Sequence, residues 1–123
     1  MKKIILLIFS AISILTFFSC LHKNDVSTLK EVSFANDIHP ILAANCTQSN
    51  CHSNNGGEFP LVTYEEVMSG GEIKAGDAHG SNLYQTISNH GFVDAMPPDP
   101  LPPLSTDQIK LVYIWIEQGA KNN

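Results

Sequence analysis

An uncharged and mostly apolar run, residues 4–18, follows Lys2 and Lys3 at the start of this 123-residue chain. A pair of lysines before such a run is typical of an export signal. The run has 15 residues, fewer than the roughly 20 that a membrane-spanning helix needs. We therefore expect residues 1–19 to be a cleaved signal. The remaining 104 residues (123 minus 19) suffice for one domain with a modest hydrophobic core.

The residues before Cys20 resemble a bacterial lipobox, in which a lipid is attached to the cysteine and the chain is cut just before it. Ser19 is the small residue that this motif requires, whereas Phe17 and Phe18 replace the usual Leu and small residue. The resemblance implies a lipidated Cys20, so residues 20–32 would be the lipid attachment point and a polar tether. The protein would then be anchored in the bacterial cell envelope, on its periplasmic side or outer surface. Ordinary secretion, with Cys20 discarded or left free, is the alternative.

The charge balance is acidic. Without the signal, five lysines and no arginine stand against twelve Asp and Glu, which gives a formal charge of -7 (5 minus 12). Binding to nucleic acid needs a basic surface, so we expect no nucleic-acid partner. The sequence also contains no Ser/His/Asp pattern, no phosphate-binding Gly-rich loop and no metalloprotease motif, so we expect no enzyme activity of these classes.

Hydrophobic periodicity predicts an all-α domain. Residues 33–45, 63–69 and 82–88 read as short helices, with Ser33 or Asn36 and then Ser81 as possible N-caps. The clearest helix begins at Ser105, which forms a capping box with Gln108, and ends at Gly119. Five of the seven prolines fall between residues 90 and 104, which favours a stiff extended loop, and no stretch predicts a strand.

Two cysteines stand close together, and the second is followed directly by a histidine. Cys46 and Cys51 have four residues between them, and His52 comes next. The usual haem attachment signature has two residues between the cysteines. In that chemistry each thiol adds to one haem vinyl group, and the following imidazole binds the iron. The polar residues 47–50 form a loop that can bulge in solvent.

Other interpretations of the two cysteines remain open at this point. An exported protein permits a disulfide between Cys46 and Cys51, and a small domain often uses one. A zinc site would need four ligands, whereas this cluster, with His52, offers three. Two idle thiols are the remaining possibility.

The order of these elements resembles a class I type cytochrome c domain over residues 33–120. The resemblance depends on the helix before Cys46, the Cys51-His52 pair, Gly56-Gly57, the Met96-Pro97-Pro98 loop and the final helix with residues 104–120. It implies three or four short helices and long loops around one covalently bound haem c, with the first and last helices crossing at the haem edge. It further implies thioether bonds at Cys46 and Cys51, a proximal iron ligand at His52 and a distal ligand at Met96.

The distal ligand has competitors. A methionine is usually core filler, but Met96 lies in the proline-rich loop, 44 positions after His52 (96 minus 52). His79 and His90 are loop histidines that could bind iron in its place, and Met68 is expected to be packing. Aromatic side chains that could line the porphyrin are Tyr84, Tyr113 and Trp115.

The resemblance implies an exported monohaem c-type cytochrome that carries one electron at a time between redox protein partners, with the membrane bound through a lipid anchor. It would be a carrier and not an enzyme, alone or as the electron-transfer subunit of a larger oxidoreductase. One alternative is a haem domain with an open sixth site that binds small ligands or reduces peroxide. The other is a haem-free binding module stapled by a disulfide.

Overall fold

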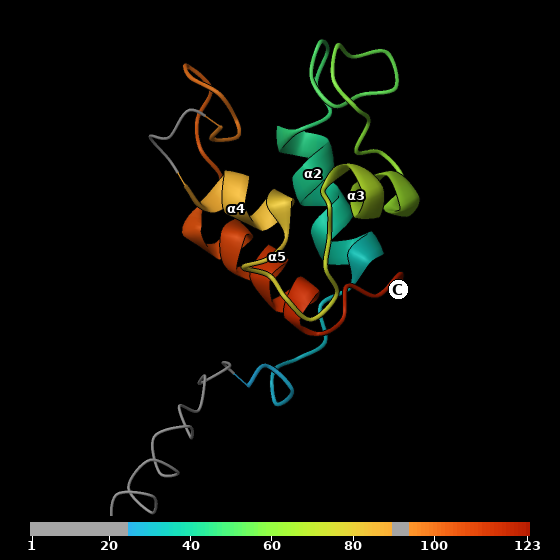
Figure 1. Cartoon of the computed structure of the whole chain (residues 1–123), viewed down its shortest axis with the longest axis vertical. Coiled ribbons are helices and arrows are strands. Elements are labelled where there is room, and N and C mark those ends of the chain that lie inside the picture. Colours follow the sequence, from blue (N-terminus) through green and yellow to red (C-terminus); the bar gives the residue numbers. More distant parts are fainter. Residues whose placement is uncertain (1–24, 90–93) are drawn as a thin grey trace, which may run out of the picture.

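The computed structural model describes residues 25–89 and 94–123, and over these residues it is helical without strands. Figure 1 labels helices α2 to α5, and one π-helical turn, η2, precedes α2 in the chain. This confirms the all-α prediction. No helix within the described ranges is long and apolar enough to cross a membrane. The elements are η2 (Phe34–Ile38), α2 (His39–Asn45), α3 (Tyr64–Gly70), α4 (Asn82–Ser88) and α5 (Thr106–Glu117).

The capping box predicted for the last helix is confirmed. The Ser105 hydroxyl accepts from the backbone N–H of Gln108 at 3.3 Å, and the Gln108 side chain accepts from the Ser105 N–H at 2.8 Å. Helix α5 ends before Gly119, whose φ of 101° is a conformation that favours glycine. A second capping box, between Thr63 and Glu66 at the start of α3, was not predicted.

The helix expected over residues 33–45 is present but is not uniform. Its first turn is the π-helical η2, and α2 continues directly from it. Ser33 is the N-cap, because its hydroxyl accepts from the N–H of Asn36. Pro40 lies in the first turn of α2, where the fixed φ of proline suits the beginning of a helix.

Ser81 is the N-cap residue of α4, as predicted, but its side chain has another role. Ser81 precedes the helix, but its hydroxyl makes no cap hydrogen bond. Instead the hydroxyl donates to the carbonyl of Asp77 at 2.8 Å and accepts from the N–H of Lys74 at 2.9 Å. The side chain is fully buried. It therefore holds the preceding loop together from the inside, which residue type alone does not indicate.

Helix α5 organises the core, because it packs against both η2 and α4. The Trp115 ring is fully buried and lies 5.6 Å from the Phe34 ring, centroid to centroid. Its indole N–H donates to the carbonyl of Lys121 at 3.0 Å. The predicted contact between the first and last helices is thus present. Other large and fully buried apolar side chains are Ile38, Leu42, Val67, Ile87, Val112 and Ile116.

The described part of the expected tether packs against the end of the chain. Val26 and Val32 are buried, and the Gln118 amide oxygen accepts from the Val32 N–H at 2.9 Å. The Gln118 amide nitrogen donates to the carbonyls of Lys30 and Val26 at 3.2 and 3.4 Å. Residues 26–32, which were expected to belong to the tether, therefore pack against the globular part. The predicted signal, residues 1–19, and the predicted lipidation site, Cys20, lie outside the described residues.

Candidate functional site

His52 is held in one orientation by the loop that follows it. Its side chain is buried, and its Nδ1 lies 2.8 Å from the carbonyl oxygen of Phe59. A carbonyl only accepts, so the neutral imidazole must carry its proton on Nδ1. The lone pair is then on Nε2, which is the arrangement of a metal-binding histidine whose other nitrogen is held by a carbonyl. The Phe59 ring also packs on the imidazole, with 4.6 Å between centroids.

Backbone hydrogen bonds close the turn that contains both cysteines and His52. The His52 N–H donates to the Cys46 carbonyl at 3.0 Å, which closes the loop between them. The Cys51 N–H donates to the carbonyl of Gln48 at 3.0 Å, and the His52 carbonyl accepts from the Leu61 N–H at 2.9 Å. Cys46, Cys51 and His52 are therefore held in one closed turn.

The long gap between the cysteines is accommodated at the end of α2. Thr47 donates its hydroxyl proton to the carbonyl of Ala43 at 3.1 Å, and Gln48 donates its amide to that of Ala44 at 3.1 Å. These carbonyls end α2 and have no further helical partner. Asn50 then reverses the chain in the left-handed region, at φ 70°. The polar residues of the gap thus act as a helix C-terminal cap, a role that was not predicted from the sequence.

Gly56 allows the chain to fold back over the second cysteine. A Cβ at this position would lie 1.8 Å from the carbonyl oxygen of Cys51 and 2.8 Å from its carbonyl carbon. No side chain fits there. A Cβ on Gly57, the next residue, would have nothing within 4 Å, so only the first glycine of the predicted pair is required by space.

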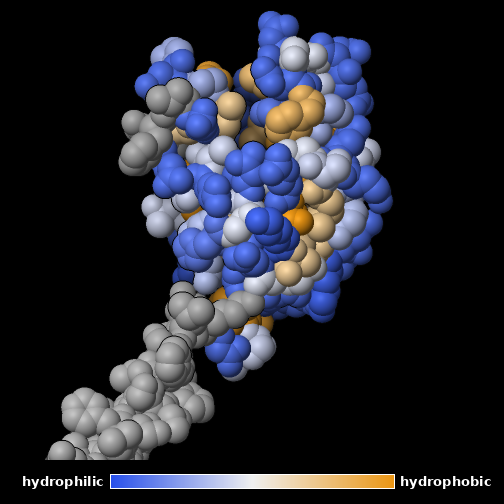
Figure 2. Space-filling view, in the orientation of Figure 1, coloured by the Kyte–Doolittle hydropathy of each residue, from blue (hydrophilic) through white to orange (hydrophobic). Residues whose placement is uncertain are grey.

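Two neighbouring hollows share Cys46, His52, Glu58 and Met96 in their walls. The larger, of about 420 Å³, is also lined by apolar side chains. The smaller, of about 190 Å³, adds Cys51. Figure 2 shows a notch between two lobes at the upper end of the molecule, with apolar surface inside it. Further apolar residues are Phe59, Leu61, Leu83 and Ile87 in the larger hollow and Pro97, Pro98 and Leu101 in the smaller.

Met96 reaches these hollows from the proline-rich loop. Its backbone N–H donates to the carbonyl of Thr86 at 3.0 Å, which fastens the loop to α4. The side chain is partly buried against the core. Met96 and His52, which are far apart in the sequence, therefore line the same space. The structure brings together all four residues predicted to hold the cofactor.

The two cysteines are free thiols in this structure. Cys46 is buried, and burial, with a smaller contribution from Cys51, raises the pKa of its thiol to about 11. Its thiol is therefore neutral at ordinary pH. Among residues 25–89 and 94–123, no group of three or more His, Cys, Asp or Glu side chains is placed to hold a metal ion. The zinc alternative therefore has no support from the described residues.

Some predicted neighbours of the site lie elsewhere. Tyr84, Tyr113 and Trp115, expected to line the porphyrin, do not line either hollow. Tyr84 and Tyr113 form an aromatic cluster with the exposed His79, at 5.3 to 5.8 Å between centroids, which places His79 outside the hollows as well. His90, the other alternative ligand, lies outside the described residues.

The apolar lining of the hollows was not predicted from the sequence. Leu83 and Ile87 were expected only to be buried, although their spacing of one helical turn puts them on one face of α4. Phe59 and Leu61 follow the cysteine pair within ten residues, in a segment without helical periodicity. Their role becomes clear only because this segment returns onto His52, through hydrogen bonds that join residues seven and nine positions apart without any periodic pattern.

No protein-family model matches this chain, and no curated protein or solved structure is significantly similar to it. The chemistry of the site must therefore be judged from its own residues. Two thiols, an imidazole with a free Nε2 and a thioether sulfur border a largely apolar space, and these are the groups that a covalently attached haem uses. The residues present fit that cofactor.

Proposed function

We propose that the protein is an exported c-type cytochrome with one covalent haem, which carries single electrons between redox partner proteins. The observation that supports this most strongly is the state of His52. Its Nδ1 is occupied by the Phe59 carbonyl, and the imidazole lines the same apolar space as Cys46 and Met96. Cys51 borders the adjoining hollow.

Each of the four residues has a distinct role in this proposal. Cys46 and Cys51 would form the thioether bonds, His52 would bind the iron through Nε2 as the expected proximal ligand, and Met96 would bind it through its sulfur as the expected distal ligand. When bound, the haem supplies an iron that alternates between the ferrous and ferric states. A thioether is a soft ligand and favours the ferrous state, so Met96 raises the reduction potential.

The chain limits how much the site changes when an electron is transferred. His52 is fixed by its ring hydrogen bond and by two backbone hydrogen bonds, and Met96 is fixed through Thr86. Ligands that do not move keep the reorganisation of the site small. Leu61, Leu83 and Ile87 contribute apolar walls that keep water away from the ligands.

The position of the hollows is consistent with a membrane-anchored carrier. The described chain begins at the lower end of the molecule, and the loops that carry the cysteines and Met96 lie at the upper end (Figure 1). A lipid on Cys20 would be attached five positions before Asp25, the first described residue, and therefore no more than roughly 18 Å from it along the chain. In this proposal the protein stands close to the envelope membrane, and its redox site faces away from it.

The first test is whether haem is attached. The full chain should be produced in a bacterial host that exports proteins and attaches haem, then analysed by haem staining of a denaturing gel and by intact mass. We expect one haem that survives denaturation and is lost when Cys46 and Cys51 are both replaced by Ala. A colourless protein, with its two sulfurs joined in a disulfide, would instead support the haem-free binding module.

The second test concerns the distal ligand. Met96→Ala should keep the covalent haem, lower the potential and remove the methionine-to-ferric-iron charge-transfer band. Met68→Ala is the matched control, because Met68 packs against the core and lines neither hollow. An unchanged spectrum in Met96→Ala would show that Met96 is not an iron ligand.

A high-spin spectrum of the unaltered protein that responds to carbon monoxide would favour the alternative function, small-ligand binding or peroxide reduction.

A further inference from the structure

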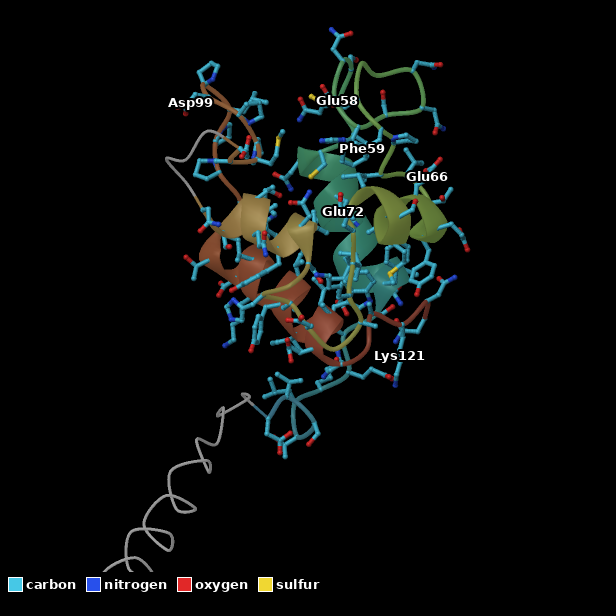
Figure 3. The ribbon with its side chains drawn as sticks, in the orientation of Figure 1. Glu58, Phe59, Glu66, Glu72, Asp99 and Lys121 are labelled. Carbon is cyan, nitrogen blue, oxygen red and sulfur yellow. The ribbon has the colours of Figure 1, made fainter. Side chains whose placement is uncertain are left out.

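The Phe59 ring lies between α3 and His52. The ring packs on the imidazole of His52, with 4.6 Å between centroids, and it also lies against Gly70 at the end of α3. A Cβ on Gly70 would lie 2.5 Å from Cδ2 and 2.9 Å from Cε2 of this ring. Phe59 is nevertheless 46% exposed, so little else confines it. Figure 3 labels Phe59 close to Glu58, near the upper end of α2.

The backbone does not explain a glycine at position 70. Gly76 and Gly119 are the glycines with positive φ in the described part of the chain, and Gly70 is not among them. An alanine would favour the helical conformation of α3 more than glycine does. A side chain at position 70 would clash with the Phe59 ring, and the ring would have to move.

We propose that Phe59 is a positioning residue for His52 and that Gly70 provides the space in which its ring sits. The inference deepens the proposed function and rests on it, since it concerns the residue expected to be the proximal ligand. Phe59 restrains one imidazole in two ways. Its carbonyl holds the Nδ1 proton, and its ring limits rotation of the imidazole plane. If Gly70 gains a methyl group, the ring is displaced and both restraints weaken together.

The test is a double-mutant cycle on the full-length protein as exported and purified, with or without haem. The readout is the rate at which the Nδ1 proton of His52 exchanges with solvent, measured by NMR in the diamagnetic state. An aromatic contact of this kind corresponds to about a two- to tenfold change in such a rate. We expect Gly70→Ala and Phe59→Ala each to raise the rate by that factor. Gly70→Ala should have no further effect in the Phe59→Ala background.

Gly57→Ala is the matched control, because it adds a methyl group to the same region without meeting any atom. It should leave the exchange rate unchanged. In haem-containing protein, a weaker hydrogen bond makes His52 a poorer electron donor, so Gly70→Ala should also raise the reduction potential. A structural effect confined to α3 would not produce this shift.

Two results would overturn the proposal. One is an exchange rate in Gly70→Ala equal to that of the unaltered protein. The other is an equal effect of Gly70→Ala with and without the Phe59 ring, which would assign the effect to Leu61 or to α3 itself. Loss of the proposed function is detected separately, because intact mass reports haem attachment independently of the exchange rate.

Discussion

Gly56→Ala gives the sharpest test of how the turn around the cysteines is built. The added Cβ would lie 1.8 Å from the Cys51 carbonyl oxygen, whereas real Cβ atoms essentially never come within 3.0 Å of such an atom. The contacted atoms belong to the backbone, so no side chain can rotate away. The turn between Cys51 and Gly56 must therefore open, and with it the position of His52 changes.

These contacts determine how much stability Gly56→Ala loses. One extra methyl group in a packed region costs about 1–3 kcal/mol. Because the clash is with backbone, we take the upper end, about 3 kcal/mol, which lowers the Tm of a domain of this size by more than about 10 °C. Gly57→Ala, with nothing within 4 Å and no positive φ, should change stability by less than about 0.5 kcal/mol.

Thermal unfolding followed by circular dichroism measures both variants, and haem staining reports how much cofactor each one retains. Gly56→Ala should have the lower Tm and a smaller fraction of haem-loaded protein. Equal Tm values for the two variants, within about 2 °C, would show that the chain does not fold back over Cys51 at Gly56.

Three further predictions follow from side chains outside this turn. Gln118→Ala removes three hydrogen bonds to residues 26–32, each worth about 1 kcal/mol, and should speed amide exchange in that segment, measured by mass spectrometry. Glu66 has a pKa below its ordinary 4.5 because it accepts from the backbone N–H of Thr63, so its contribution to stability is present above about pH 4.5 and lost in more acidic solution. Glu66→Gln should therefore flatten the fall in Tm between about pH 5 and pH 3. In haem-free protein Cys46 should react with iodoacetamide much more slowly than Cys51 at pH 8, because its thiol has a pKa of about 11 and is buried; equal rates by peptide mapping would contradict this.

Local signals were sufficient to predict most of the helices. Helix α5 has its apolar residues at regular spacing, a capping box at Ser105 and a glycine at its end, and all of these operate within a few residues of one another. The short helices α3 and α4 were also located within one residue at each end. The π-helical turn before α2 was not predicted, because it differs from an α-helix only in hydrogen-bond register.

Part of the candidate site could also be predicted from local sequence, and part of it could not. Cys46, Cys51 and His52 are neighbours in sequence, and residue type alone indicates their chemistry. The placement of Met96 beside them came only from a resemblance, and the structure supplies the tie to Thr86 that brings it there. The roles of Phe59 and Gly70 depend on a loop returning to a helix end. Sequence patterns of period 2 or 3.6 carry no information about such a return.

The two ends of the molecule differ in how they are held together. At the lower end, Asn123 accepts from Ala35 and Ser33 and donates to the Val32 carbonyl, and Trp115 anchors the final residues. Lys121, labelled in Figure 3, adds an ion pair with Glu31.

At the upper end, the lobes that carry His52 and Met96 enclose open space of several hundred cubic ångströms, bordered by apolar side chains. Packed protein interiors leave few voids larger than a water molecule, so apolar walls of this kind are stabilised when a ligand fills them. The covalent haem proposed here would be the missing part of the core. The redox site would then lie in the part of the fold that is least stable by itself, whereas the opposite end is held by the chain's own hydrogen bonds.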